Sequence, residues 1–219
     1  MPACASCFIR RRRRKPPAIH AAAPHTPGGR QSAPEELQSP PELWPPGSPA
    51  ALAERNPDFV GWITIEGVID YPVVRGSDNS YYLTVTFSGK YNSAGAILMD
   101  YRNALGFDEP VCIIYGHNMR NLSMFTPLSS YNDPEFMVKH PDIAITTPEG
   151  EARLYRVFDA RRTDMWDRAY ALDFSDGAEA AGEFRGAPDR ASHFLILSTC
   201  TSSEDRSERM LVYASLVDQ

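Results

Sequence analysis

The 219-residue chain contains no apolar run long enough to cross a membrane as a helix. A secretory signal peptide is not predicted either, because the basic residues 10–15 follow a short apolar stretch and no hydrophobic segment comes next. Cysteine is scarce, with four residues in the chain, so its usage does not indicate the redox compartment. No His, Cys, Asp or Glu residues after position 49 have the spacing of metal ligands, so we expect no metal ion and no other cofactor.

Basic residues are also scarce in the larger, C-terminal part of the chain. The net charge is −6, yet residues 1–55 hold eight Lys or Arg and four acidic residues, and the remainder holds fourteen and twenty-four. A protein that binds nucleic acid needs a cationic face for the phosphates. The acidic remainder therefore argues against nucleic acid as a partner.

Proline is concentrated at the N-terminus. Residues 1–49 contain eleven of the nineteen prolines, and they show no apolar periodicity. Such a segment cannot bury enough apolar surface to offset the entropy of ordering it. We therefore predict a disordered segment over residues 1–49 and a folded domain over residues 50–219. Cys4 and Cys7 form one CxxC pair in this segment, without the second pair that a zinc site would need.

The second part of the chain shows many short apolar or alternating runs separated by turn residues. We expect strands over 62–65, 69–74, 95–99, 111–115, 143–147, 152–160, 194–200 and 210–217. We expect helices or helical turns over 49–59, 79–83, 124–131, 134–139 and 172–184. About eight short strands with few helices favour a mainly β fold, closed into a β-barrel because closure leaves no unpaired edge.

Three of these strands carry reactive side chains at their ends. The apolar strand 194–200 ends at Cys200, the strand 111–115 leads into His117, and Arg209 immediately precedes the strand 210–217. A short polar loop after Cys200 predicts a hairpin that sets Cys200 across from Arg209. A lone cysteine in such a strand is more often a small buried residue. Together, however, a thiol, an imidazole and a guanidinium supply the nucleophile, proton carrier and oxyanion donor that acyl transfer through a thioester needs.

Other residues of the same types lack this setting. Arg206 lies in the middle of the polar loop, where we expect it to be solvated. His193 points away from the Cys200 face by strand parity, and His140 precedes a proline. Asp70 and Asp100 could be offered as a third member of a triad, but the chemistry does not require one and we leave both out.

These motifs resemble those of a known family. The segments YGHNM at 115–119 and LSTC at 197–200, with Arg209 before an apolar strand, resemble the active-site motifs of sortases. The segments 56–63, 70–74, 78–83, 95–103 and 124–125 resemble class B of that family. The resemblance runs from residue 50 to the C-terminus. It implies a closed eight-stranded barrel with an N-terminal helix and a few short peripheral helices, one of them before the cysteine strand.

The resemblance also implies a role for each site residue. Cys200 would be the nucleophile, His117 the proton carrier and Arg209 the oxyanion donor of a cysteine transpeptidase. The substrate contacts carried over from the class are Asn79, Leu83, Ser198 and Thr201. The segment before the cysteine strand is shorter here than is usual for class B, and the N-terminal membrane anchor expected for the family is not seen in this chain.

The expected partners follow from the same resemblance. The enzyme would cleave a sorting signal of the Asn-Pro-x-Thr-x kind after Thr and pass the protein to a peptidoglycan amine. We expect a monomer on the extracytoplasmic side, at the membrane and cell wall of a Gram-positive cell. Two alternatives stay open: a sortase of another signal preference or a pilus-type polymerase, and a non-catalytic barrel that only binds peptides.

Overall fold

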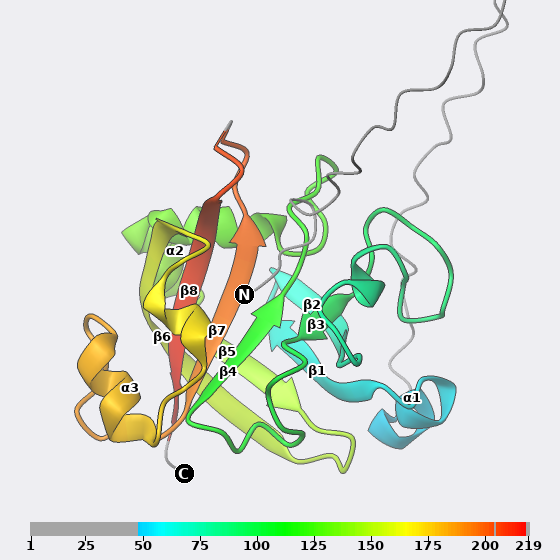
Figure 1. Cartoon of the computed structure of the whole chain (residues 1–219), viewed down its shortest axis with the longest axis horizontal. Coiled ribbons are helices and arrows are strands. Elements are labelled where there is room, and N and C mark those ends of the chain that lie inside the picture. The colour runs from blue at the N-terminus through cyan, green and yellow to red at the C-terminus, as the bar shows by residue number, and fades with distance from the viewer. Residues whose placement is uncertain (1–47, 204, 218–219) are drawn as a thin grey trace, which may run out of the picture.

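The computed structural model describes residues 48–203 and 205–217 (Figure 1). The predicted disorder of the N-terminal segment and the Cys4–Cys7 pair lie outside the described residues. In the described part, eight strands close into a barrel in the order β1-β2-β3-β4-β7-β8-β6-β5, with β5 pairing back onto β1. The predicted mainly β, closed eight-stranded barrel is therefore confirmed. The strands are β1 (Phe59–Ile65), β2 (Ile69–Val74), β3 (Ile97–Met99), β4 (Val111–Tyr115), β5 (Asp142–Thr146), β6 (Ala152–Asp164), β7 (Phe194–Cys200) and β8 (Glu208–Leu216).

Most neighbouring strands are antiparallel, but β2 with β3 and β4 with β7 are parallel pairs. Parallel partners need long connections. The connection between β4 and β7 contains two strands and several helices, whereas β7 and β8 form a hairpin. This mixed order places the carboxyl ends of β4 and β7 side by side (Figure 1).

The helices are short and lie outside the barrel (Figure 1). They are α1 (Pro49–Arg55), η2 (Tyr81–Leu83), η3 (Thr126–Asn132), α2 (Pro134–Lys139), η4 (Arg168–Ala171) and α3 (Gly177–Glu183). Side-chain oxygens that accept from backbone N–H groups begin four of them: Ser48 caps α1, Asp133 caps α2, Asp167 caps η4 and Asp176 caps α3.

Two predicted helices were too long. The helix predicted over 49–59 ends at Arg55, because Phe59 already pairs with Val74 as the first residue of β1. The helix predicted over 172–184 is only α3, because Leu172 adopts a left-handed backbone with φ of 54° and Asp176 caps a new start. The strand predicted to end at residue 160 instead runs to Asp164, since β8 pairs with it along that length.

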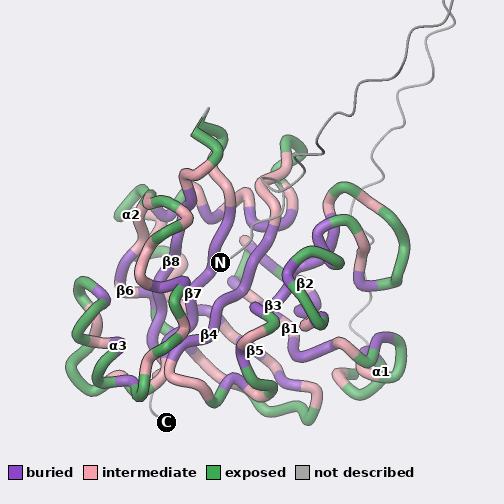
Figure 2. Tube along the Cα trace, in the orientation of Figure 1, coloured by how far each residue is buried: buried purple, intermediate pink, exposed green. Residues whose placement is uncertain are grey.

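Both faces of the central strands are buried, which explains their continuous apolar sequences. Along β7, Leu195 and Leu197 pack with residues from all around the barrel, whereas Phe194 and Ile196 pack on the other face with residues of α3 and η4. In Figure 2 most of the trace along these strands has the colour of buried residues. The burial stops at Cys200, the one half-buried residue of β7. The strand end is therefore the point at which this core meets solvent.

Among the described helices, none has the length and apolar character that would let it cross a membrane.

Candidate active site

The hairpin of β7 and β8 pairs Cys200 with Arg209, as the short connecting loop predicted. Cys200 is half-buried, whereas Arg209 is only 1% exposed. The Arg209 Nη1 donates to the backbone carbonyls of Arg206, at 2.7 Å, and Glu208, at 2.8 Å. The loop thus holds the guanidinium beside the strand position that bears the thiol.

The parallel pairing of β4 with β7 brings His117 to the same rim. Tyr115 pairs with Ser198, so the residues two positions further on, His117 and Cys200, leave the sheet at the same level. The Asn118 side-chain amide donates to the Cys200 carbonyl at 3.0 Å and ties the two strand ends together. Gly116 follows the last residue of β4 and precedes His117. A larger residue does not fit there, because its Cβ would lie 2.6 Å from side-chain atoms of neighbouring residues.

A backbone carbonyl orients the imidazole. The His117 Nε2 lies 2.9 Å from the Leu83 carbonyl oxygen. A carbonyl only accepts hydrogen bonds, so this contact requires the proton of the ring to be on Nε2. η2, in which Leu83 is the last residue, therefore contributes to the site through its backbone.

Asn79, a predicted substrate contact, is only 6% exposed and binds other protein groups. Its Nδ2 donates to the Asp100 carboxylate and its Oδ1 accepts from the Tyr101 N–H, both at 2.9 Å. The Leu83 side chain is buried, and its carbonyl binds His117. Substrate contact by these two side chains stays a prediction. In this structure the Asn79 side chain and the Leu83 carbonyl bond to other parts of the protein.

Ser198 and Thr201, the other predicted contacts, flank Cys200 on β7 and its loop. The Ser198 hydroxyl is buried and lies 2.8 Å from the Tyr170 hydroxyl of η4. The Thr201 hydroxyl donates to the Glu208 carboxylate across the hairpin. Thr201 is half-exposed, whereas Ser198 is buried under η4, and substrate contact by both stays a prediction.

Asp100 is a site component that the sequence analysis left out. Its carboxylate is fully buried, and it accepts from Asn79, from the Tyr115 hydroxyl at 2.7 Å, and from the backbone N–H and two guanidinium nitrogens of Arg102 at 2.9 Å. Burial acts to raise the pKa of this carboxyl, but hydrogen bonds from Arg102 and Tyr115 outweigh it and hold the pKa below its usual value. Local sequence carries no signal for this cluster beyond the nearby Arg102, because the donors come from three separate segments.

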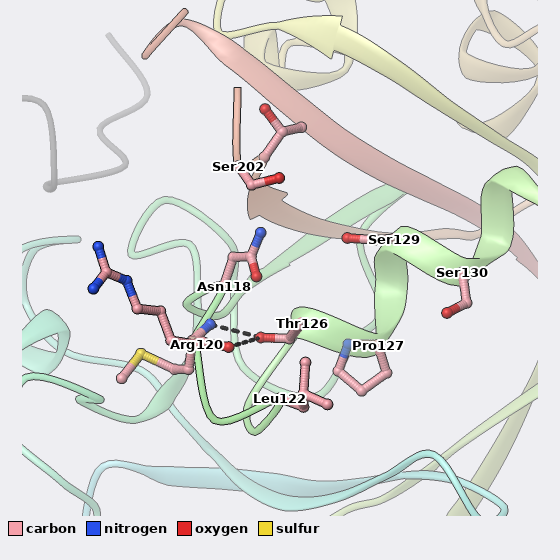
Figure 3. Close-up of a pocket in the computed structure, with 10 residues that line it drawn as sticks. Asn118, Arg120, Leu122, Thr126, Pro127, Ser129, Ser130 and Ser202 are labelled. Atoms are coloured by element: carbon pink, nitrogen blue, oxygen red, sulfur yellow. Dashed lines mark hydrogen bonds between the residues drawn. The ribbon is translucent and has the colours of Figure 1, made fainter. Parts of the chain in front are cut away.

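A pocket of about 720 Å³ is lined by Asn118 and Thr201, the residues that follow His117 and Cys200 in the chain, but not by His117 or Cys200 themselves. We call it the η3 pocket, since η3, the loop after β4 and the start of the β7–β8 loop form its walls (Figure 3). Its lining residues are Asn118, Met119, Arg120, Leu122, Thr126, Pro127, Ser129, Ser130, Thr201 and Ser202. The sequence analysis did not predict it, because it forms only where distant loops meet.

The second cysteine of the described part differs from Cys200 in every respect that affects reactivity. Cys112 lies in the middle of β4 and is buried, and that burial raises the pKa of its thiol to about 12. In the described residues, no group of three or more His, Cys, Asp or Glu side chains is placed to hold a metal ion.

Comparisons with known protein sequences identify the family of this chain. The sortase domain family model matches residues 63–217. The chain is 32% identical over 179 residues to Sortase B of Listeria monocytogenes, covering 76% of this chain and 72% of that protein. It is 30% identical over 181 residues to Sortase B of Staphylococcus aureus, covering 76% and 73%.

Solved structures show the same relation. The X-ray structure of Clostridium perfringens sortase B matches with a TM-score of 0.68 and 27% identity, over 77% of this chain and 98% of that chain. The Staphylococcus aureus sortase B–substrate complex matches with a TM-score of 0.68 and 28% identity, over 77% and 83%. The chain therefore belongs to the sortase family, whose members are cysteine transpeptidases. Within the family its relatives are sortases B, which confirms the predicted resemblance to class B.

Proposed function

We propose that this sortase cleaves a sorting signal of the Asn-Pro-x-Thr-x kind after Thr and transfers the protein to a peptidoglycan amine. The observation that carries the proposal is the shared rim, where Cys200 pairs with Arg209 and the parallel pairing of β4 with β7 sets His117 level with Cys200. The class B relatives support the choice of signal. A structure of the Staphylococcus aureus relative in complex with its substrate supports peptide binding.

The first half-reaction forms a thioester. The Cys200 thiolate attacks the carbonyl carbon of the signal's Thr, and the developing oxyanion accepts hydrogen bonds from Arg209 and from a backbone N–H near Thr201. The C–N bond then breaks, and the protonated His117 gives its proton to the leaving amine. The part of the signal that follows Thr leaves with the new amino group, and the acyl group that ends in Thr stays on the Cys200 sulfur.

The second half-reaction transfers the acyl group. His117, now neutral, takes a proton from the incoming amine as the amine attacks the thioester carbonyl. A new amide bond forms, the C–S bond breaks, and Cys200 is regenerated as thiolate. Sortases act at the cell-surface side of the membrane. We accordingly place this chain there as a monomer, with secreted surface proteins and peptidoglycan as its partners.

Mass spectrometry of the full chain with signal peptide and no amine tests the proposal. We expect the wild-type enzyme to carry one acyl group on Cys200, and Cys200→Ala to carry none. Cys112 should stay unmodified in both, because it is buried and its thiol pKa is about 12. An adduct on Cys112, or none at all with Asn-Pro-type or Leu-Pro-type signals, would contradict the proposal.

A second candidate function differs in the acceptor. A class B sortase of Streptococcus pyogenes that is involved in pilus biogenesis matches this structure with a TM-score of 0.67 and 26% identity, over 76% of this chain and 96% of that chain. If this chain joins pilus subunits, the acyl-enzyme should react faster with a lysine side chain of a folded protein than with a cell-wall peptide. A competition between the two acceptors separates the functions.

A further inference from the structure

Asp100 and Arg102 lie in the connection between β3 and β4, where a buried carboxylate faces a half-buried guanidinium. The Arg102 Nε and Nη2 each donate to one oxygen of Asp100 at 2.9 Å, which is the two-pronged pairing that suits these groups. The Asp100 N–H donates to the Ile113 carbonyl at 2.9 Å and so fixes the pair to β4. The pair is therefore attached to the strand that leads into His117.

This pair holds a different element on each side. On the Asp100 side it binds Asn79, which precedes η2, the element whose last carbonyl contacts His117. On the Arg102 side, the same Nη2 also donates to the Tyr170 carbonyl of η4 at 3.0 Å. One arginine thus joins the element that contacts His117 to the element that covers β7.

The position of η4 depends on contacts at both of its ends. It is a 3-10 helix of four residues, and a helix this short is not stable by itself. At its start, the Asp167 carboxylate caps it and accepts from the Tyr213 hydroxyl of β8. At its end, where Leu172 has a left-handed backbone with φ of 54°, the Arg102 guanidinium binds the Tyr170 carbonyl. Loss of this guanidinium would leave the second end of η4 less firmly held.

A peptide that reaches Cys200 meets both elements. Ser198 and Cys200 share one face of β7, because side chains alternate along a strand. Tyr170 of η4 covers Ser198 through a contact of 2.8 Å between the two hydroxyls, and the burial of this face ends at Cys200. An acyl donor on Cys200 therefore lies beside the end of η4, while η2 orients His117 for the leaving amine. The separation of η2 and η4 then decides how well the peptide fits.

We propose that Arg102 is a positioning residue for the sorting signal: by bridging Asp100 and the Tyr170 carbonyl, it fixes η4 relative to η2 before the peptide binds. This inference rests on the proposed function. Arg102 acts through the backbone of η4 and not on the reacting atoms. When an element occupies its binding position for only a fraction of the time, the apparent affinity falls by that fraction. Loss of the bridge therefore weakens binding of the peptide but does not slow the reaction of the bound peptide.

Single-turnover acylation of Arg102→Lys by a signal peptide of the Asn-Pro-x-Thr-x kind tests the bridge. Lysine keeps the positive charge beside Asp100, but its compact ammonium lacks the planar fork that reaches the carboxylate and the Tyr170 carbonyl together. We expect the half-saturating peptide concentration to rise about ten-fold, as for an η4 in its binding position about a tenth of the time. The maximal acylation rate and the melting temperature should stay close to those of wild type.

Arg153→Lys is the matched control. The Arg153 guanidinium also bridges a carboxylate and a carbonyl, those of Asp108 at 2.6 Å and Phe107 at 3.0 Å, and it is buried to a similar degree. It lies at the start of β6, whereas the end of that strand pairs with Arg209. The control should acylate as wild type does. A wild-type half-saturating concentration for Arg102→Lys, or an equal rise for Arg153→Lys, would overturn the inference.

A second measurement leaves Arg102 unchanged. Hydrogen exchange of Cys200→Ala, which should bind the signal peptide without being acylated, is followed with and without saturating peptide. We expect slower exchange with peptide both at the Tyr170 N–H of η4 and at the Thr84 N–H that follows η2, and no change at the Gly150 N–H of the β5–β6 turn. Unchanged exchange at Tyr170 would overturn the inference, even if Arg102→Lys did not fold. Failure of the wild type to form an acyl-enzyme would instead contradict the proposed function.

Discussion

At the scale of single residues, position along a strand decides what a reactive side chain can do. Cys112 and Cys200 lie on neighbouring, parallel strands, but Cys112 is in the middle of β4 and Cys200 is the last residue of β7. Burial removes the first thiol from chemistry at neutral pH, since only the thiolate is a strong nucleophile. The second lies where strand meets loop, and a substrate can reach it.

The same contrast separates two arginines of the β7–β8 hairpin. Arg209 is buried opposite Cys200, whereas Arg206 is exposed in the loop. We expect Arg209→Ala to slow acylation on the order of a hundred- to a thousand-fold, as for loss of an oxyanion donor in other enzymes. Arg206→Ala should acylate at close to the wild-type rate. The rates are measured by mass spectrometry of quenched single-turnover reactions.

Arg209 also donates to the backbone carbonyls of Arg206 in the loop and Glu208 at the start of β8, so its loss would remove two contacts that hold the hairpin. Arg209→Lys keeps the positive charge but loses the planar fork, and it should fold and still acylate slowly. If Arg206→Ala were the impaired variant, the assignment of the oxyanion donor would be wrong.

At the scale of elements, η2 is a short helix whose position depends on its neighbours. Gly95, just before β3, touches it so closely that a Cβ would lie 2.3 Å from the Tyr82 carbonyl oxygen. Asn79 fastens the other side of η2 to Asp100 and Tyr101. The Leu83 carbonyl at the end of η2 binds His117. The contacts of Gly95 and Asn79 that hold η2 therefore also position the candidate proton carrier.

The substitution Asp100→Asn tests whether the buried Asp100 carboxylate stabilises this arrangement of η2. The variant removes the charge that binds Arg102, Tyr115 and Asn79, and we expect it to lower the free energy of unfolding by about 1–3 kcal/mol. The folded-state pKa of Asp100 is depressed, so its contribution is present above the usual aspartate pKa of about 3.9 and is lost as the pH falls through the lower folded-state value. The difference between wild type and variant should therefore be constant near neutrality and shrink in acid.

Denaturant unfolding across that pH range measures this difference. Asp108→Asn is the control, because that carboxylate is largely exposed and its loss should change stability by less than about 0.5 kcal/mol. Equal stability of the Asp100 variant and wild type at pH 7 would show that the buried carboxylate does not hold η2.

At the scale of the whole molecule, the described domain begins with the cap of its first helix. The Ser48 hydroxyl accepts from the Ala51 N–H, and Leu52 of α1 packs into the core outside the barrel. The predicted boundary at residue 49 thus falls inside the first turn of α1. The helix belongs to the domain, and its N-cap is the residue before that boundary.

Truncation tests the prediction that the N-terminal segment is dispensable. A chain that begins at Ser48 should cleave signal peptide at the wild-type rate and melt at the wild-type temperature. A chain that begins at Pro49 should also fold and cleave, but it lacks the cap and should be less stable by about 1 kcal/mol. Calorimetry and a peptide-cleavage assay measure both properties. A large fall in melting temperature for the Ser48 chain would show that residues 1–47 support the fold.

Local sequence determined the number and kind of the strands, because apolar runs and turn residues report burial over a few neighbours at a time. It also determined that Cys200 would face Arg209, since a short loop leaves a hairpin little choice of register. The motifs around His117 and Cys200 were enough to indicate the family. In contrast, the ends of the helices at 49–59 and 172–184 were wrong, because tertiary pairing and an internal cap set them.

Only the tertiary structure decided how the site is held together. The His117–Leu83 contact joins residues 34 positions apart, and the Asn118–Cys200 bond joins residues 82 apart. The Asp100 cluster and the η3 pocket likewise gather side chains from separate loops. A local pattern reports which residues are buried, but the path of a loop depends on the barrel that its ends are fixed to. The candidate reactive groups could therefore be proposed from the sequence, whereas the groups that contact them and the pocket formed by the neighbouring loops could not.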